Sequence, residues 1–129
     1  MSQQKIFLVG AGIAGWEGFG ARALEVINSA DLLIGHQRLL DIFPDFKGKK
    51  QTYGDLSIML EFLKDTDQRV VVLSSGDPNF FGVARFLLRN LPKERIEIFP
   101  NVTSTQYAFA RIKEPWDDAI FLSVHGRGQ

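Results

Sequence analysis

The sequence predicts an α/β domain with three layers, in which helices cover both faces of a mostly parallel five-stranded sheet. Short apolar runs alternate with amphipathic helical patterns about five times along the chain. The strongest runs are aliphatic and lack polar alternation, which is typical of strands buried on both faces. The intervening lengths suit the crossovers that join parallel strands. Three of these runs end in small or hydroxyl-bearing turns, where α/β sheets bind ligands.

The composition restricts the class of protein. The chain has 129 residues, 45% of them hydrophobic, so we expect one domain that spans residues 1–129. Lys and Arg number 15, as do Asp and Glu, so no excess charge favours nucleic acid or an acidic membrane as a partner. Cysteine is absent, and no run approaches the roughly 20 apolar residues of a membrane span. We therefore expect a cytoplasmic protein.

The first expected strand is Ile6 to Val9, and it ends in a turn that contains Gly10, Gly12 and Gly15. Glycine lets the backbone of such a turn approach a ligand closely, because no Cβ intervenes. A helix of about ten residues should follow. Its apolar face consists of Phe19, Ala23, Val26, Ile27 and Ala30.

The middle of the chain predicts a second strand over residues 31–35 and one or two helical turns over residues 36–43, which end before Pro44. The basic stretch 46–53 suggests a weak edge strand. Apolar residues at i, i+3, i+4 and i+7 then predict an amphipathic helix. They are Leu56, Met59, Leu60 and Leu63.

Residues 68–73 form the clearest strand pattern and lead into the loop 74–79. We expect the next helix over residues 80–91, with Asp77 as its N-cap and Pro78 at its first position. Residues 95–99 alternate like a half-exposed strand.

The turn 100–105 should open a short helix that runs through Ala110, with Thr103 or Ser104 as its cap. The apolar segment from Ala119 to Val124 predicts a last buried strand.

The glycine turn could bind a ligand that is not a dinucleotide, and two other interpretations of it stay open. Residues 10–15 match the dinucleotide fingerprint, which would indicate a nicotinamide- or flavin-binding domain of an oxidoreductase. That site needs an acidic residue at the end of the second strand, and Asp31 instead stands at its start. Alternatively, the glycines serve backbone geometry alone.

The loops 75–82 and 100–106 follow two other strands and contain small or hydroxyl-bearing residues. Because carboxyl ends of parallel strands share one sheet edge, we expect these loops and the glycine turn to form one continuous rim. The two histidines, His36 and His125, have no carboxylate at metal-ligand spacing, so we expect no metal site. No serine has the nucleophile-elbow pattern, and we name no catalytic residue.

In these motifs the chain resembles the tetrapyrrole (corrin/porphyrin) methylase family. The matching pieces are Val9-Gly-Ala-Gly-Ile, Ser75-Gly-Asp-Pro-Asn-Phe-Phe-Gly and Pro100-Asn-Val-Thr-Ser-Thr, in the order and spacing of the family. Further pieces resemble the branch that methylates C(5) of precorrins or cobalt-precorrins, alone or fused to a C(15)-methylating part. They are Gly15-Trp-Glu-Gly-Phe, Ala30-Asp-Leu-Leu-Ile-Gly-His-Gln-Arg, Ala108-Phe-Ala-Arg, Pro115-Trp-Asp-Asp-Ala and His125-Gly-Arg.

The resemblance implies a methyltransferase of cobalamin biosynthesis that uses S-adenosyl-L-methionine as methyl donor. It also implies a corrinoid precursor as substrate, a homodimer, and the N-terminal domain of the methylase fold. The implied cofactor-binding residues are Gly10, Gly12, Ile13, Gly76, Asp77, Phe80, Thr103 and Ser104.

Family members continue into a second α/β domain, so the resemblance implies that this chain is a truncated part of a longer protein. A non-catalytic fragment or assembly module is therefore a further alternative.

Overall fold

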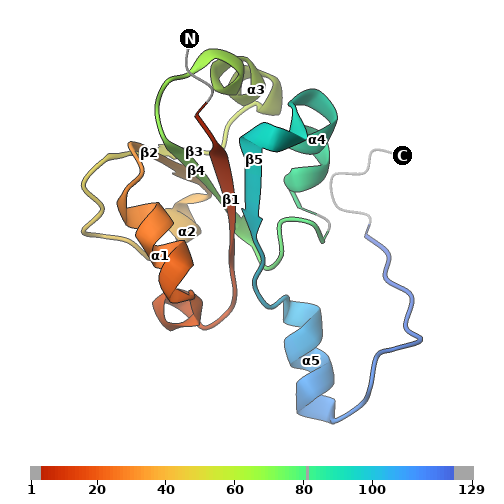
Figure 1. Ribbon diagram of the computed structural model, residues 1–129. Coiled ribbons are helices and arrows are strands. Elements are labelled where there is room, and N and C mark those ends of the chain that lie inside the picture. The colour runs from red at the N-terminus through yellow and green to blue at the C-terminus, as the bar shows by residue number, and fades with distance from the viewer. Residues whose placement is uncertain (1–3, 81, 124–129) are drawn as a thin grey trace.

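The computed structural model describes residues 4–80 and 82–123. Five strands and five α-helices follow one another along this part of the chain (Figure 1). In order, the elements are β1 (Ile6–Ala11), the 3-10 helix η1 (Gly15–Gly18), α1 (Ala21–Asn28), β2 (Leu32–Gly35), α2 (Gln37–Leu40), β3 (Lys49–Thr52), α3 (Leu56–Asp65), β4 (Val70–Ser75), α4 (Ala84–Asn90), the 3-10 helix η2 (Lys93–Arg95), β5 (Ile96–Phe99) and α5 (Ser104–Ile112).

The sheet has the strand order β3-β2-β4-β1-β5, and every neighbouring pair is parallel. Ile6 of β1 lies opposite Val70 of β4 on one side and Ile96 of β5 on the other. The predicted fold class is confirmed, and the sheet is wholly parallel. All five carboxyl ends consequently meet at one edge.

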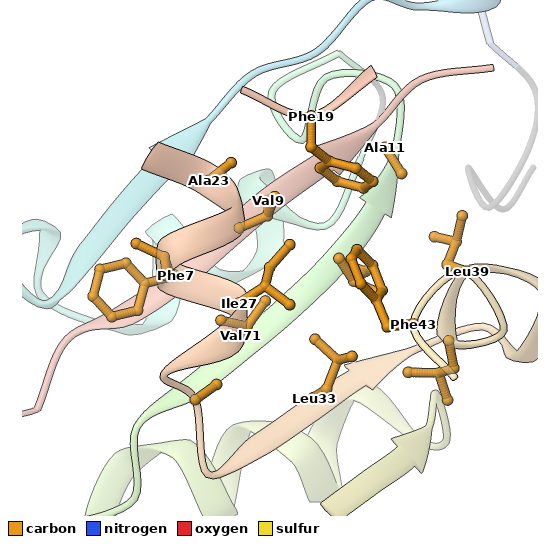
Figure 2. Close-up of a cluster of buried hydrophobic side chains, with 14 residues drawn as sticks. Phe7, Val9, Ala11, Phe19, Ala23, Ile27, Leu33, Leu39, Phe43 and Val71 are labelled. Carbon is orange, nitrogen blue, oxygen red and sulfur yellow. The ribbon is translucent and has the colours of Figure 1, made fainter. Parts of the chain in front are cut away.

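Alternate residues of the central strands face opposite layers, because side chains of a strand alternate with period two. Figure 2 shows the layer on which α1 and α2 pack, where Phe7, Val9 and Val71 lie under Ile27. Ile6, Leu8 and the other residues of opposite parity face α3 and α4 instead. Two apolar cores, one on each side of the sheet, account for the predicted three-layer arrangement.

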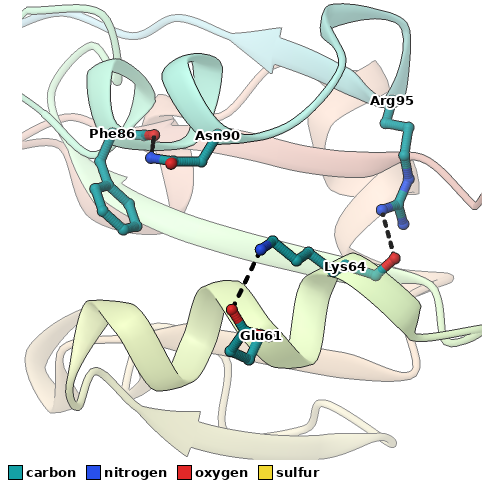
Figure 3. Close-up of polar contacts among 5 residues, drawn as sticks. All are labelled: Glu61, Lys64, Phe86, Asn90 and Arg95. Carbon is teal, nitrogen blue, oxygen red and sulfur yellow. Dashed lines mark hydrogen bonds and ion pairs between the residues drawn. The ribbon is translucent and has the colours of Figure 1, made fainter.

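A buried arginine fixes the amino end of this assembly. Arg95 is only 5% exposed, and its guanidinium donates to the carbonyl oxygens of Leu63, at 2.9 Å, and Gln4, at 3.1 Å. Figure 3 shows its further bond to the carbonyl of Lys64. The Leu63 and Lys64 carbonyls belong to the last turn of α3, where carbonyls lack a partner within the helix, so the cation binds where the helix dipole favours it.

The predicted start of α4 is wrong. The helix begins at Ala84, and its N-cap is Val83, without a side-chain cap bond. Asp77 does not cap it: its Oδ1 accepts from the Asn79 amide at 2.9 Å. The Phe80 amide donates to the Asp77 carbonyl, so residues 77–80 form a separate tight turn before the helix. Local turn bonding competes with helix initiation at such residues.

The predicted last strand is also wrong over residues 119–123, which adopt no strand, while Val124 lies outside the described residues. Ile120 and Leu122 are 86% and 88% exposed. An apolar run becomes a strand only where a neighbouring strand can bond its backbone, and this segment lies beyond α5, apart from the sheet (Figure 1). The ring of Phe121 instead packs edge-on against Trp116, with centroids 5.7 Å apart.

Within the described residues, no helix is long and apolar enough to cross a membrane.

The two faces of α3 allow a direct test of the core. Leu63 is fully buried, whereas Ile58 on the same helix is 69% exposed. Leu63→Ala should lower the free energy of unfolding by about 2–5 kcal/mol, because it leaves a cavity between α3 and the sheet. Ile58→Ala, the control, should change it by less than about 0.5 kcal/mol. Urea unfolding measures both, and equal effects would contradict the assignment of the buried face.

Candidate functional site

A cavity of about 390 Å³ opens at the carboxyl edge of the sheet, where the loops after β1, β4 and β5 converge. This volume is in the range of small-molecule sites. Its described lining consists of Ala11, Gly12, Ile13, Arg38, Ser75, Gly76, Phe80, Val102, Thr103, Ser104 and Thr105.

The first two loops touch through their backbones. The Gly76 amide donates to the Ala11 carbonyl at 2.7 Å, and Gly76 has a φ of +66°, a conformation that favours glycine. A Cβ on Gly10 would overlap the Gly76 carbonyl oxygen. Gly10 is thus required for the close approach of the loops, and it does not line the cavity.

Asn101 joins the third loop to the first. Its Nδ2 donates to the carbonyl oxygens of Gly10, at 3.0 Å, and Gly18, at 3.1 Å. Its Oδ1 accepts from the Val102 amide at 2.8 Å, and a Cβ on Gly12 would come within 2.9 Å of the same oxygen. The sequence interpretation missed this residue, although the Pro100-Asn101 pair after a strand is a known turn signal.

The third loop ends in the predicted cap. Thr103 Oγ1 accepts from the Gln106 amide at 3.2 Å, and Gln106 Oε1 accepts from the Thr103 amide at 2.6 Å. This reciprocal capping box begins α5. It leaves Ser104 and Thr105 at the cavity wall.

The structure brings six of the eight predicted cofactor-binding residues to this one cavity. Gly12, Ile13, Gly76, Phe80, Thr103 and Ser104 line it. Gly10 and Asp77 do not: Gly10 lies between the loops, and the Asp77 carboxylate is engaged by the Asn79 amide.

Arg38 is a cavity residue that was not predicted, and it contacts Ser75 of the predicted rim. Arg38, on α2 after β2, donates from Nη2 to Ser75 Oγ at 2.9 Å. Arg38 reaches the cavity because β2 lies beside β4 in the sheet, and this strand order cannot be read from the sequence.

The same edge continues to β3, where the rings of His36 and Tyr53 lie with centroids 4.7 Å apart. Burial raises the pKa of Tyr53 to about 12, so its phenol stays neutral at physiological pH. Among residues 4–80 and 82–123, no three His, Cys, Asp or Glu side chains gather as a metal site.

The family follows from comparison with known proteins. The model of the Tetrapyrrole (Corrin/Porphyrin) Methylases matches residues 5–128. The chain belongs to this methylase family. It is 37% identical over 122 residues to the cobalt-precorrin-7 C(5)-methyltransferase of Salmonella typhimurium, covering 93% of this chain and 61% of that protein.

Solved structures of the methylase family share the fold. A precorrin-6Y methylase from Archaeoglobus fulgidus superposes with a TM-score of 0.69 at 25% identity, over 86% of this chain and 59% of that one. A uroporphyrin-III C-methyltransferase from Thermus thermophilus, solved with S-adenosylhomocysteine, gives 0.60 at 25%, over 78% and 46%. The chain spans 61% of the length of the first curated relatives that it matches.

Membership of the methylase family disfavours the dinucleotide interpretation, and the local geometry agrees. That fingerprint requires an α-helix to begin at the last glycine and receive a pyrophosphate. Here Gly15 begins a 3-10 turn, and α1 starts only at Ala21. The Asp31 carboxylate accepts from the Arg69 amide at 2.8 Å, at the amino end of the strands.

Two glycines of the first loop region test the contact between loops. Gly10→Ala should lower the free energy of unfolding by about 1–3 kcal/mol, because the new Cβ must displace the Gly76 backbone. Gly20→Ala is the control, since a Cβ there meets nothing within 4 Å. Thermal unfolding compares the two variants, and a Gly10→Ala protein as stable as wild type would contradict the contact.

Proposed function

We propose that the protein containing this chain is an S-adenosylmethionine-dependent C-methyltransferase that acts on a precorrin or cobalt-precorrin in cobalamin biosynthesis. The observation that carries the proposal is the cavity formed by three loops of a tetrapyrrole methylase domain. The C(5)-methyltransferase named above supports C(5) as the methylated position.

The chemistry of the lining suits the proposed donor. Ile13, Phe80 and Val102 offer apolar surface for a nucleoside and a thioether, while Ser104 and Thr105 offer hydroxyls. Ile13 is 66% exposed, so its surface is free for a ligand to cover. The solved relative with S-adenosylhomocysteine supports the same class of ligand.

The donor, when bound, supplies an activated methyl group on a sulfonium. Transfer to carbon is an in-line displacement in which the new carbon–carbon bond forms as the methyl–sulfur bond breaks and S-adenosylhomocysteine leaves. The reduced macrocycle is itself the nucleophile, and the proton of the methylated carbon passes to solvent, so we assign no acid, base or metal to this chain. We propose that its residues orient the donor methyl group toward the acceptor carbon. The loop backbones hold the donor, and Ile13 and Phe80 exclude water from it. Orientation of this kind lowers a barrier by several kcal/mol.

The proposal includes features of the whole protein. We place Gly10 and Asp77 behind the cofactor site as supports of its loops, and propose a homodimer in the cytoplasm. A second domain would add a further wall to the cavity, and the greater length of the relatives supports this. The non-catalytic module is the alternative that the binding experiment below addresses.

Calorimetric titration of the full-length protein separates the classes of ligand. S-adenosylhomocysteine should bind with a dissociation constant in the micromolar range or below, and NADH should show no saturable heat. Tight NADH binding without a response to the thioether would restore the oxidoreductase. Absence of binding by both ligands would favour a non-catalytic module.

Variants at two exposed isoleucines test whether the ligand binds in the cavity. Ile13→Ala should weaken S-adenosylhomocysteine binding about tenfold, because apolar contact with the ligand is lost. Ile58→Ala removes the same atoms from α3, outside the cavity lining, and should leave the affinity unchanged. The same calorimetric titration measures both. If both variants bind S-adenosylhomocysteine with equal affinity, the donor site does not lie in this cavity.

A further inference from the structure

Arg38 is the one formally charged side chain among the described residues of the cavity wall. It is exposed, and it projects from α2, on the side of the cavity nearest β2. Its described side-chain bond is the one from Nη2 to Ser75 Oγ. A guanidinium carries five N–H donors, so most of them remain directed at solvent or at a ligand.

No carboxylate among residues 4–80 and 82–123 forms an ion pair with this guanidinium. Neither described ion pair, Arg22 with Glu97 or Lys64 with Glu61, involves Arg38. Asp41, one turn further along, accepts instead from Gln37 Nε2 at 2.7 Å. A positive group is thus held at the cavity without a carboxylate of the described chain beside it.

Ser75 gives the arginine a defined position. It is the last residue of β4, and its neighbour Ser74 pairs with Gly10 in the central strands. A strand end in the middle of a sheet is a rigid support, and the hydroxyl that it carries restrains a side chain from the adjacent strand connection. Such restraint reduces the entropy that a flexible arginine loses when it binds.

We propose that Arg38, positioned by Ser75, binds a carboxylate of the ligand in this cavity. The inference rests on the proposed function, which brings carboxylates from two sources: the amino-acid part of the donor, and the acidic side chains of the tetrapyrrole acceptor. The planar guanidinium matches a carboxylate with two parallel bonds. Arg38 is a binding residue here, and Ser75 is a positioning residue.

Binding measurements on the full-length protein distinguish the two sources. S-adenosylhomocysteine is compared with 5′-methylthioadenosine, which lacks the amino-acid part, by calorimetry. Uroporphyrin is compared with its methyl ester by fluorescence titration. Arg38→Gln should weaken at least one of the two acids about tenfold or more, and leave its carboxylate-free counterpart unchanged. Loss of the thioether acid assigns the donor, and loss of uroporphyrin assigns the acceptor.

Variants separate this role from a structural one. Arg38→Lys keeps the positive charge but cannot make two parallel bonds to a carboxylate, so it should lose part of the affinity for the acid that Arg38 binds. Ser75→Ala should weaken the same ligand, and the double variant should bind no worse than Arg38→Gln alone, since both act through one contact. Arg85→Gln makes the same substitution on the exposed side of α4, outside the cavity lining, and should bind as wild type.

The inference is overturned if Arg38→Gln affects neither acid, or if it weakens an acid and its counterpart equally. If the wild-type protein does not bind S-adenosylhomocysteine, the proposed function is contradicted. In that case uroporphyrin binding that depends on Arg38 still supports the inference, and uroporphyrin binding that does not depend on Arg38 overturns it. A wild-type protein that binds the thioether, with affinities independent of Arg38 for both acids, overturns the inference alone.

Discussion

The site depends on backbone contact between loops that are far apart in the sequence. The Gly10 and Gly76 backbones meet with no space for a Cβ at Gly10, and the Asn101 side chain bonds the Gly10 carbonyl from the other side. Gly10 and Ala11 are buried, so their carbonyls must find partners within the protein, and they accept from Asn101 and from the Gly76 amide. Fixing one loop therefore fixes the others, and the shape of the cavity follows from all three together.

The parallel sheet explains why this contact lies where it does. In a wholly parallel sheet every carboxyl end meets the same edge, and the central strands β1 and β4 supply two adjacent ends. The two apolar cores hold these strands from both faces, and Arg95 ties the opposite end of the sheet to α3. The rigid part of the domain thus carries the loops, while specificity is left to the residues on them.

Local patterns predicted much of this structure. The aliphatic runs of β1 and β4, the apolar spacing of α3 and the Thr103 cap all depend on neighbours in sequence, and the structure contains each of them. The failure over residues 119–123 depends on distant partners, whereas the failure at Asp77 comes from a competing local turn. The segment 119–123 has a strand pattern but no strand beside it, and the Asp77 carboxylate turned to Asn79 rather than to a helix. Asn101 and Arg38 were missed because their roles arise from strand order.

A cation in this cavity has a consequence for the proposed donor, which itself carries a positive sulfonium. Two unit charges about 8 Å apart repel by roughly 2 kcal/mol at an effective dielectric constant near 20. Arg38 would therefore oppose the donor unless an anion lies between them or beside the arginine. A carboxylate on either substrate removes this cost and gains the guanidinium bonds. Electrostatics thus favours a site in which a carboxylate, from the amino-acid part of the donor or from the acidic acceptor, pairs with Arg38 over one that holds the sulfonium beside an unpaired arginine.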